Sequence, residues 1–390
     1  MTEIKYKKIE NALRPYFLKL DYFLTYHIFK RIMNKDICVE EIKNILVVEN
    51  TFIGDLINAT PVFKVLKENF KNSKITVMCL NKSKEVIENN KNVDNIIAID
   101  NEPKFFDFRK WILIKKEVKK RDFQLAIILH HGGVAISLLL LLAKIKYRLG
   151  CTRTGILKGK GFFLNKKIYP QNSIRHIVEQ NLDVLKLIPV KIDESWKRIE
   201  INCKKEEEEK IINKFNLSNK NKYVGVHIGT QHKSQRWQTE KWVEVINHLI
   251  LQKNTFVILT GTENDLEEIN YLLNKIEKKE KIIIAAGETN LRELFALVKQ
   301  LNLIISIDTS AVHIAAAFNI PTITLYGPGN PETWHPWQKN AKWIIKDEVC
   351  TRCRQHFCIW SYLNKKKEFE CMKSIATGDI IILLEKKNES

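Results

Sequence analysis

The sequence predicts an α/β protein made of two Rossmann-like domains that face a central cleft. Short apolar runs rich in β-branched residues alternate with longer helical segments, and this alternation is typical of parallel sheets covered by helices. The alternation stops after residue 188, passes through a polar stretch, and restarts near residue 223. With 390 residues, the chain also has the length of two domains of ordinary size.

Composition and charge limit the class of protein. The hydrophobic fraction of 45% indicates a chain that folds around a core, and the net charge of +19 points to nucleic acid or an anionic membrane surface. No zinc-finger, basic-zipper or RNP pattern is present to read bases, which argues against nucleic acid. The chain shows no secretory signal, and its apolar run at 134–143 is shorter than the roughly 20 residues that span a bilayer. We therefore expect a cytoplasmic protein whose eight cysteines are reduced.

The amino-terminal segment, residues 1–43, is expected to be a basic amphipathic extension. Within it, residues 6–34 place aromatic side chains and leucines among lysines and arginines at helical spacing. A helix of this kind can lie in a membrane interface, or it can pack on the domain behind it. Both interpretations remain open, and the first would place the protein peripherally on the inner face of the cytoplasmic membrane.

The first Rossmann-like domain is predicted at residues 44–188. Thr60 is expected to cap a helix whose first residue is Pro61, because proline fits the first helical position. The expected strands are 45–48, 75–79, 96–99 and 123–129. The expected helices are 61–70, one between the second and third strands, 105–119, one that starts near Val134, and 174–187.

A polar linker is predicted at residues 189–204, and the second Rossmann-like domain at residues 205–390. The same alternation of short apolar runs and helical segments returns there. The expected strands are 223–228, 255–260, 282–285, 302–307 and 322–326. The expected helices are 239–251, 263–275, 291–299 and 311–318.

The turn that follows strand 302–307 carries the clearest candidate site. Asp308, Thr309 and Ser310 are good N-cap residues, and His313 follows in the helix behind them. Ligands of open α/β sheets bind beyond the carboxyl ends of the strands, where helix amino termini attract anions. We expect a phosphate-bearing ligand here. The alternative is that Asp308 and Ser310 only cap the helix while His313 packs against its neighbours.

The turn that follows the first strand carries Gly54 and Asp55. A carboxylate beyond a strand end can accept a proton from an incoming hydroxyl group, although an acid at a helix start can also serve only to stabilise the helix dipole. The first turn has only Gly54, and the turn near 229 has only Gly229. A dinucleotide fingerprint needs three close glycines, so NAD is disfavoured, and no Walker or HExxH motif is present.

Two further turns of the second domain carry polar side chains. The turn after strand 223–228 offers Thr230, Lys233 and Arg236, whose hydroxyl and cationic groups suit phosphate oxygens. The turn after strand 255–260 offers Glu263, which could accept hydrogen bonds from a ribose or a base. All these turns lie at equivalent strand ends of one domain, so we expect one composite site.

Positions 44–373 resemble the ADP-heptose:lipopolysaccharide heptosyltransferases and their glycosyltransferase family 9 relatives, and the blocks match in order and spacing. The blocks are ILVVENTFIGDLINATPVFKVLK, VHIGTQHKSQRWQTEKW, ILTGTEND, IISIDTSAVHIAAAFNIPTITLYGP and CTRCRQHFC followed by a fourth cysteine. The resemblance implies the glycosyltransferase B fold and an inverting, metal-independent glycosyltransferase that uses no cofactor.

The resemblance also implies roles for residues. It implies that Asp55 is the base, and that the nucleotide sugar contacts Thr230, Arg236, Glu263 and the turn that carries Asp308, Thr309, Ser310 and His313. Three residues depart from the family pattern. Ser310 stands where the family often has glycine, Glu49 where a basic residue is usual, and Arg236 where lysine is usual. These departures concern the donor sugar more than the fold.

Other candidates are less specific. Gly54, Asn58, His130, His131 and Gly132 lie at strand ends of the first domain and are candidates for the acceptor groove. His176 is similar to a family position on the closing helix, or is simply a packed helix residue. Four cysteines have a spacing compatible with a structural zinc ion, with free thiols as the alternative: Cys350, Cys353, Cys358 and Cys371.

We therefore expect transfer of a heptose from ADP-heptose to a lipid-linked or core-oligosaccharide acceptor at an anionic membrane surface. Two alternatives remain: another nucleotide-sugar donor such as one of an N-acetylhexosamine, and a catalytically inactive sugar-nucleotide-binding protein.

Overall fold

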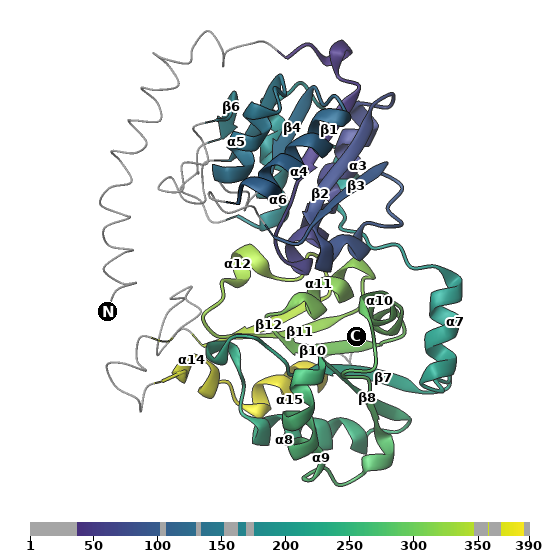
Figure 1. The fold of residues 1–390 in the computed structure, drawn as a ribbon. Helices are drawn as coiled ribbons and strands as arrows, with labels where there is room; N and C mark the ends of the chain where they lie inside the picture. Colours follow the sequence, from purple (N-terminus) through teal and green to yellow (C-terminus); the bar gives the residue numbers. More distant parts are fainter. Residues whose placement is uncertain are drawn as a thin grey trace. The chain divides into compact units, whose positions relative to one another are not determined.

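The chain divides between Arg198 and Ile199 into two units, each built on a six-stranded parallel sheet (Figure 1). This division falls inside the stretch predicted as a linker. The computed structural model describes residues 37–101, 107–129, 134–151, 163–168, 175–346, 358 and 368–385. The predicted extension at 6–34 and the acceptor candidates His130, His131 and Gly132 lie outside the described residues.

The sheet of the amino-terminal unit has the strand order β3-β2-β1-β4-β5-β6. Its strands are β1 Asn44–Val48, β2 Lys74–Leu80, β3 Asn95–Ile99, β4 Leu125–Ile128, β5 Tyr147–Cys151 and β6 Lys166–Ile168. Its α-helices are α3 Ile53–Asn69, α4 Phe108–Lys120, α5 Val134–Leu142 and α6 Ile177–Asp183. Its short 3-10 helices are Val39–Glu41, Asn81–Val86, Val184–Leu187 and Glu194–Lys197.

Strand β1 of this sheet is easy to recognise in the sequence because it is buried on both faces. Ile45, Leu46, Val47 and Val48 of β1 are all fully buried, because helices cover both faces of the sheet. A strand buried on both faces reads as a continuous apolar run. The predicted strands 45–48, 75–79, 96–99 and 123–129 all correspond to strands of the structure, with shifts of one or two residues at their ends.

The prediction that Thr60 caps a helix starting at Pro61 was wrong, because α3 begins at Ile53. Proline has no N–H group and leaves the carbonyl of Ile57, four residues earlier, without its helical donor. The Thr60 hydroxyl donates a hydrogen bond of 2.7 Å to this Ile57 carbonyl oxygen instead. The helix therefore continues through Pro61, and its first turn contains Asp55.

Three other elements of this unit differ from the prediction. The segment between β2 and β3 forms the 3-10 helix Asn81–Val86 and no α-helix. Strands β5 and β6 were not predicted. In β5 the buried Arg148 interrupts the apolar pattern, and its guanidinium group donates to the carbonyl oxygens of Ile145 and Phe163. Strand β6, with the sequence KKI, is a half-buried edge strand and lacks an apolar run.

The sheet of the carboxy-terminal unit has the strand order β12-β11-β10-β7-β8-β9. Its strands are β7 Lys222–His227, β8 Thr255–Thr260, β9 Ile282–Ile284, β10 Leu303–Ile307, β11 Thr322–Tyr326 and β12 Ala341–Ile345. Its α-helices are α7 Lys205–Lys214, α8 Thr239–Leu251, α9 Leu266–Leu273, α10 Leu291–Lys299, α11 Ser310–Ala317, α12 Pro331–Trp334, α14 Glu370–Lys373 and α15 Thr377–Glu385. Its short 3-10 helices are Lys233–Gln235, Glu263–Asp265 and Lys279–Lys281.

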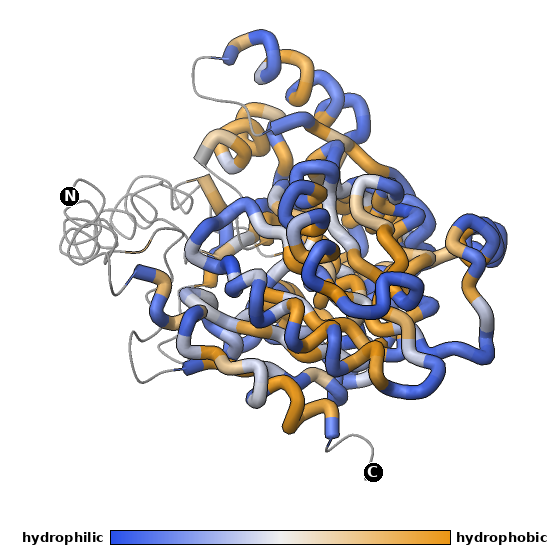
Figure 2. The backbone as a smooth tube through the Cα atoms, turned by 90° about the horizontal axis from the view of Figure 1, so that it is seen from below, coloured by the Kyte–Doolittle hydropathy of each residue, from blue (hydrophilic) through white to orange (hydrophobic). Residues whose placement is uncertain are grey.

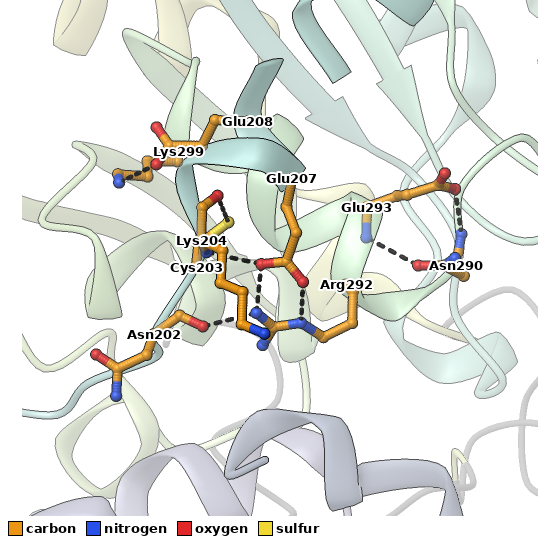
Figure 3. Close-up of polar contacts among 9 residues, drawn as sticks. All are labelled: Asn202, Cys203, Lys204, Glu207, Glu208, Asn290, Arg292, Glu293 and Lys299. Atoms are coloured by element: carbon orange, nitrogen blue, oxygen red, sulfur yellow. Dashed lines mark hydrogen bonds and ion pairs between the residues drawn. The ribbon is translucent and has the colours of Figure 1, made fainter. Parts of the chain in front are cut away.

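Helix α7, which was not predicted, is held to α10 by ion pairs. Arg292 of α10 forms a two-pronged ion pair with Glu207 of α7, with nitrogen–oxygen distances of 2.8 and 2.5 Å (Figure 3). The Arg292 hydrogen bonds lower the pKa of Glu207 to about 2. Figure 2 shows α7 as a mostly hydrophilic coil at the right. Its residues KEEEEKIINK contain too few apolar positions to reveal a helix by periodicity.

The chain ends on two helices that were not predicted either. Helix α15 packs against α8 and β12, and Figure 2 shows its apolar run beside the carboxyl terminus. The Trp237 indole nitrogen donates to the carbonyl oxygen of Ile375 over 3.1 Å, which ties the segment between α14 and α15 to the start of α8. None of the helices in the described ranges combines the length and the apolar character needed to cross a membrane.

Candidate functional site

The candidate base, Asp55, is a buried carboxyl group in the first turn of α3, directly beyond the carboxyl end of β1. One carboxyl oxygen, Oδ2, accepts the backbone N–H of Phe52 over 3.1 Å. Burial raises the pKa of Asp55 to about 6, against the opposite effect of hydrogen bonds from the Phe52 backbone and the Thr51 side chain. A pKa near neutrality suits a group that must be ionised at pH 7 and still accept a proton.

A second acid, Glu49, lies at the end of β1 and is more deeply buried than Asp55. Its backbone N–H donates to the Met78 carbonyl oxygen over 2.9 Å, which fixes the residue beside β2. The Thr51 hydroxyl lies 2.5 Å from Glu49 Oε1, and the Thr51 side chain also hydrogen bonds with Asp55. Two carboxyl groups therefore share one hydroxyl partner, a relationship that the sequence did not reveal.

The other described acceptor candidates lie on α3. Gly54 is in its first turn and Asn58 in its second, and both are buried. Asn50, which the sequence did not single out, is 7% exposed, and neither polar atom of its amide has a hydrogen-bond partner among the described residues. A buried amide without hydrogen-bond partners lowers the stability of the fold. The turn between β1 and α3 is therefore a candidate for binding a ligand.

His176 does not belong to this turn. Its backbone is extended, and its side chain caps α6 by accepting the Val178 N–H on Nδ1 over 3.2 Å. The ring is buried. The structure therefore gives His176 a capping role at the start of the closing helix.

The candidate donor site lies at the carboxyl edge of the second sheet. From β7, the strands β8 and β9 extend this sheet in one direction, and β10, β11 and β12 extend it in the other. The change of direction between β7 and β10 is a topological switch point, where open α/β sheets bind ligands. The predicted donor-binding residues follow β7, β8 and β10, so adjacency of these strands brings their turns to one edge.

At the end of β10, the cap residue of α11 is Thr309, while Ser310 is the first residue of the helix. The Thr309 side chain makes no capping hydrogen bond, and its hydroxyl lies 3.2 Å from Ser306 Oγ. Thr309 therefore occupies the N-cap position between Asp308 and Ser310, and the alternative that these two residues only cap the helix stays a prediction. Asp308, Thr309 and Ser310 are half exposed at the amino end of α11, and a helix amino end is a place where an anion can bind.

His313, one turn further into α11, is buried. Burial, and after it the charge of His335, lower the pKa of His313 to about 4. The imidazole ring is therefore neutral at pH 7, where it can donate or accept a hydrogen bond without adding charge. His335 stacks on Trp343 with ring centroids 4.9 Å apart, and its Nδ1 lies 2.8 Å from the Pro331 carbonyl oxygen.

The loop after β11, which the sequence did not flag, closes around Asp308. A Cβ atom on Gly329 would lie 2.6 Å from Asp308 Oδ2, so this glycine permits the turns after β10 and β11 to approach each other. A Cβ atom on Gly327 would lie 2.7 Å from the Met372 side chain and 3.3 Å from the Ser234 carbonyl oxygen. Asn330, next in the loop, is buried, and within the described part of the chain its Oδ1 has no hydrogen-bond partner. The GPGNP sequence directly after a buried strand could have indicated this loop in the sequence.

The turn after β7 holds Thr230, Lys233 and Arg236. Thr230 Oγ1 accepts the His232 N–H over 3.1 Å and donates to Gln235 Oε1 over 3.0 Å, so this hydroxyl shapes its own turn. Lys233 is exposed in the 3-10 helix Lys233–Gln235. Arg236 lies 3.6 Å from Glu268 of α9, an ion pair that a bound phosphate would have to displace.

The turn after β8 holds Glu263, which is exposed. Its buried neighbour Asp265 was missed, although it has the larger structural role. Asp265 Oδ2 accepts the Thr262 N–H over 2.7 Å and the Thr262 hydroxyl over 2.9 Å. A Cβ atom on Gly229 would overlap the Asp265 carboxylate. This glycine therefore permits the turns after β7 and β8 to touch.

No group of three or more His, Cys, Asp and Glu side chains within the described ranges is placed to hold a metal ion. Of the four spaced cysteines, Cys350 and Cys353 lie outside the described residues. Cys358 Sγ accepts the Phe369 N–H over 3.4 Å, and Cys371 is buried in the core. Neither forms a disulfide, and the zinc alternative stays a prediction.

The chain matches the family model described as Glycosyltransferase family 9 (heptosyltransferase) over residues 111–363. It is 28% identical over 295 residues to lipopolysaccharide heptosyltransferase 3 of Escherichia coli K12, a match that covers 74% of this chain and 83% of that protein.

Two solved structures show the same fold. The family 9 glycosyl transferase of Veillonella parvula has a TM-score of 0.73 at 23% identity and covers 88% of this chain and 96% of its own. The Escherichia coli heptosyltransferase WaaC, solved with ADP-2-deoxy-2-fluoro heptose, has a TM-score of 0.66 at 16% identity. The match covers 88% of this chain and 99% of WaaC. These likenesses confirm the predicted α/β fold with two Rossmann-like units.

Proposed function

The chain belongs to glycosyltransferase family 9, and on this premise we propose that it transfers a heptose from ADP-heptose to a lipopolysaccharide-core or related glycan acceptor. Membership of the family makes it a glycosyltransferase. The sugar and the acceptor are proposed because a similar protein of Escherichia coli K12 is a lipopolysaccharide heptosyltransferase, and because WaaC was solved with an ADP-heptose analogue.

The observation that carries the mechanism is the buried Asp55 carboxyl with its pKa near 6 at the carboxyl end of β1. In the proposed reaction, an acceptor hydroxyl oxygen bonds to the anomeric carbon of the heptose while the bond from that carbon to the diphosphate breaks. The hydroxyl proton goes to Asp55, and ADP leaves. Attack from the face opposite the diphosphate inverts the anomeric configuration.

The donor is assigned to the carboxyl edge of the second sheet. The amino end of α11 and the cations Lys233 and Arg236 would stabilise the charge that develops on the diphosphate. Thr230 would hold the turn in shape, neutral His313 would supply a hydrogen bond, and Glu263 would accept one from the ribose or the base. These fixed groups would replace a divalent metal ion, so metal independence is part of the proposal.

The acceptor is assigned to the amino-terminal unit, where Asp55 lies. Gly54 and Asn58 lie in the first two turns of α3. His130, His131 and Gly132 are kept as acceptor candidates because they follow β4, the strand beside β1 at the switch point of the first sheet. A lipid-linked acceptor would place the enzyme at the inner face of the cytoplasmic membrane.

The test is an assay of the purified chain with a lipopolysaccharide-core acceptor and a panel of donors: ADP-heptose, UDP-N-acetylhexosamines and other sugar nucleotides. We expect ADP release that depends on the acceptor, and a product whose anomeric configuration by NMR is inverted. Turnover only with a different nucleotide sugar would select the alternative donor. Donor binding by calorimetry without any product would select the inactive binding protein.

A further inference from the structure

Helix α4 presents an outward face that is both apolar and cationic. Seven of its thirteen residues are exposed, and none of the seven is acidic. Three are large apolar side chains: Phe108 at 71%, Ile112 at 66% and Leu113 at 66% exposure. The other four are Arg109, Lys116, Lys119 and Lys120.

The inward face of the same helix explains how it is held. Ile114 and Val118 are buried in the core of the unit, and Trp111 packs against that core. These three residues recur at helical spacing, so the exposed residues necessarily lie on the opposite side. Helix α4 also contacts α5.

The cations of the outward face are not neutralised by the helix itself. Both nearby acids pair with other residues: Asp107 with Lys110 over 3.6 Å, and Glu117 with Arg121 over 2.6 Å. Within the part of the chain that the structure describes, none of Arg109, Lys116, Lys119 and Lys120 forms an ion pair. The face therefore carries four free positive charges around three apolar side chains.

We propose that α4 docks the protein on an anionic lipid bilayer, with Phe108, Ile112 and Leu113 in the interface and the four cations against the lipid headgroups. A helix of thirteen residues is about 20 Å long, too short to span roughly 30 Å of hydrocarbon, so it lies in the plane of the surface. This inference rests on the proposed function and deepens it. Helices α4 and α3 both follow strands of one parallel sheet, so their first turns lie at the same edge of that sheet. Docking through α4 would therefore bring the edge that carries Asp55 towards a lipid-linked acceptor.

Charge complementarity favours lipid over the other possible occupants. A second copy of the chain would bring four further cations to the same face. Residues 1–36 contain eight Lys or Arg and four Asp or Glu, so this segment is also basic and would be repelled. Nucleic acid would pair with the cations but would leave three large apolar side chains in water. An anionic bilayer satisfies both features of the face.

The test measures binding of the full chain to vesicles of phosphatidylglycerol and phosphatidylethanolamine, without donor or acceptor, by co-sedimentation over a range of salt concentrations. The apolar variant Ile112→Gln/Leu113→Gln should bind at least about tenfold more weakly at low salt. The charge variant Lys116→Gln/Lys119→Gln/Lys120→Gln should lose roughly fivefold for each cation removed, and its binding should depend less on salt.

The matched control is Leu251→Gln/Ile382→Gln in the carboxy-terminal unit, where these side chains are 63% and 51% exposed. It should bind like the wild type, and all variants should keep the wild-type melting temperature. Wild-type binding by both α4 variants would overturn the inference and place docking in another segment. A change from dimer to monomer in the apolar variant, or no wild-type binding at low salt, would also overturn it. Because no substrate is present, the transferase assay stays an independent test of the proposed function.

Discussion

The Thr51 hydroxyl and Glu49 Oε1 are joined by a hydrogen bond of 2.5 Å at the end of β1. The Thr51 side chain also bonds with Asp55. A hydroxyl group carries one hydrogen and cannot donate to two carboxylates at once. One of the two contacts is therefore best satisfied when its carboxyl group carries a proton. Glu49 thus competes with the candidate base for the same donor.

Replacing Glu49 should therefore change the pH dependence of the reaction. In Glu49→Gln, the neutral amide can donate to Thr51, whose hydrogen then goes to Asp55. This hydrogen bond stabilises ionised Asp55, so its pKa should fall from about 6 by roughly one unit. The acid limb of kcat/KM against pH should move to lower pH by the same amount.

Thr51→Val is the matched variant for this prediction, because it keeps Glu49 and removes the shared donor. It should move the acid limb in the opposite direction, to higher pH, since the Thr51 hydrogen bond lowers the pKa of Asp55 in the wild type. Cys79 of β2, near Glu49, has its pKa raised to about 12 by burial and stays neutral throughout. Identical profiles for both variants and the wild type would show that Glu49 and Asp55 titrate independently.

Removing the candidate base should stop catalysis and spare donor binding. In Asp55→Asn, kcat should fall at least about a hundredfold, because the acceptor hydroxyl loses its proton acceptor. The dissociation constant for ADP-heptose should stay within a few-fold, since the donor is assigned to the other unit. Calorimetry and initial rates measure the two quantities, and a kcat within tenfold of the wild type would exclude Asp55 as the base.

Chelation should leave turnover intact. The amino end of α11 with Lys233 and Arg236 is proposed to stabilise the diphosphate, and fixed protein groups need no metal ion. After dialysis against EDTA, kcat should remain within about twofold of its starting value. Loss of turnover that Mg²⁺ or Mn²⁺ restores would mean that the charge of the leaving group is balanced differently.

Buried His313 should make the fold sensitive to acid. Its pKa is lowered from 6.5 to about 4, so the unfolded chain binds this proton more tightly than the folded chain. The stabilising contribution is complete above pH 6.5 and is lost as the pH falls towards 4, by about 3 kcal/mol in all. In His313→Gln, the free energy of unfolding should fall less between pH 7 and 5, as chemical denaturation would measure. An equal fall in both proteins would contradict burial of a neutral ring.

Gly329→Ala should weaken donor binding. The added methyl group would lie 2.6 Å from Asp308 Oδ2 and would force this carboxylate away from the amino end of α11. The KM for the donor should rise about tenfold or more while the KM for the acceptor stays unchanged. Gly378→Ala is the control, because a Cβ atom there meets no atom within 4 Å. Equal donor KM values in the two variants would remove Asp308 from the donor site.

Much of this protein can be predicted from the chain alone, for a physical reason. Strands buried on both faces, such as β1 and β10, are nearly continuous apolar runs, so their positions are visible in the sequence without a fold. Strand ends in a parallel sheet share one edge, so the residues that follow β7, β8 and β10 could be assigned to one site in advance. We did not predict the edge strands β6 and β12 or the charged helix α7. Exposed positions need not be apolar, so these elements lack a clear apolar pattern.

The tertiary structure decided which groups touch. The continuation of α3 through Pro61 involves the Thr60 hydroxyl, which bonds to the Ile57 carbonyl oxygen in place of the missing proline N–H. The approach of Gly329 to Asp308 follows from the pairing of β10 with β11, and the contact of Gly229 with Asp265 from the pairing of β7 with β8. The amino-acid order determined which chemistry reaches the strand ends. Strand adjacency and burial determined which of these side chains meet, and at what pKa.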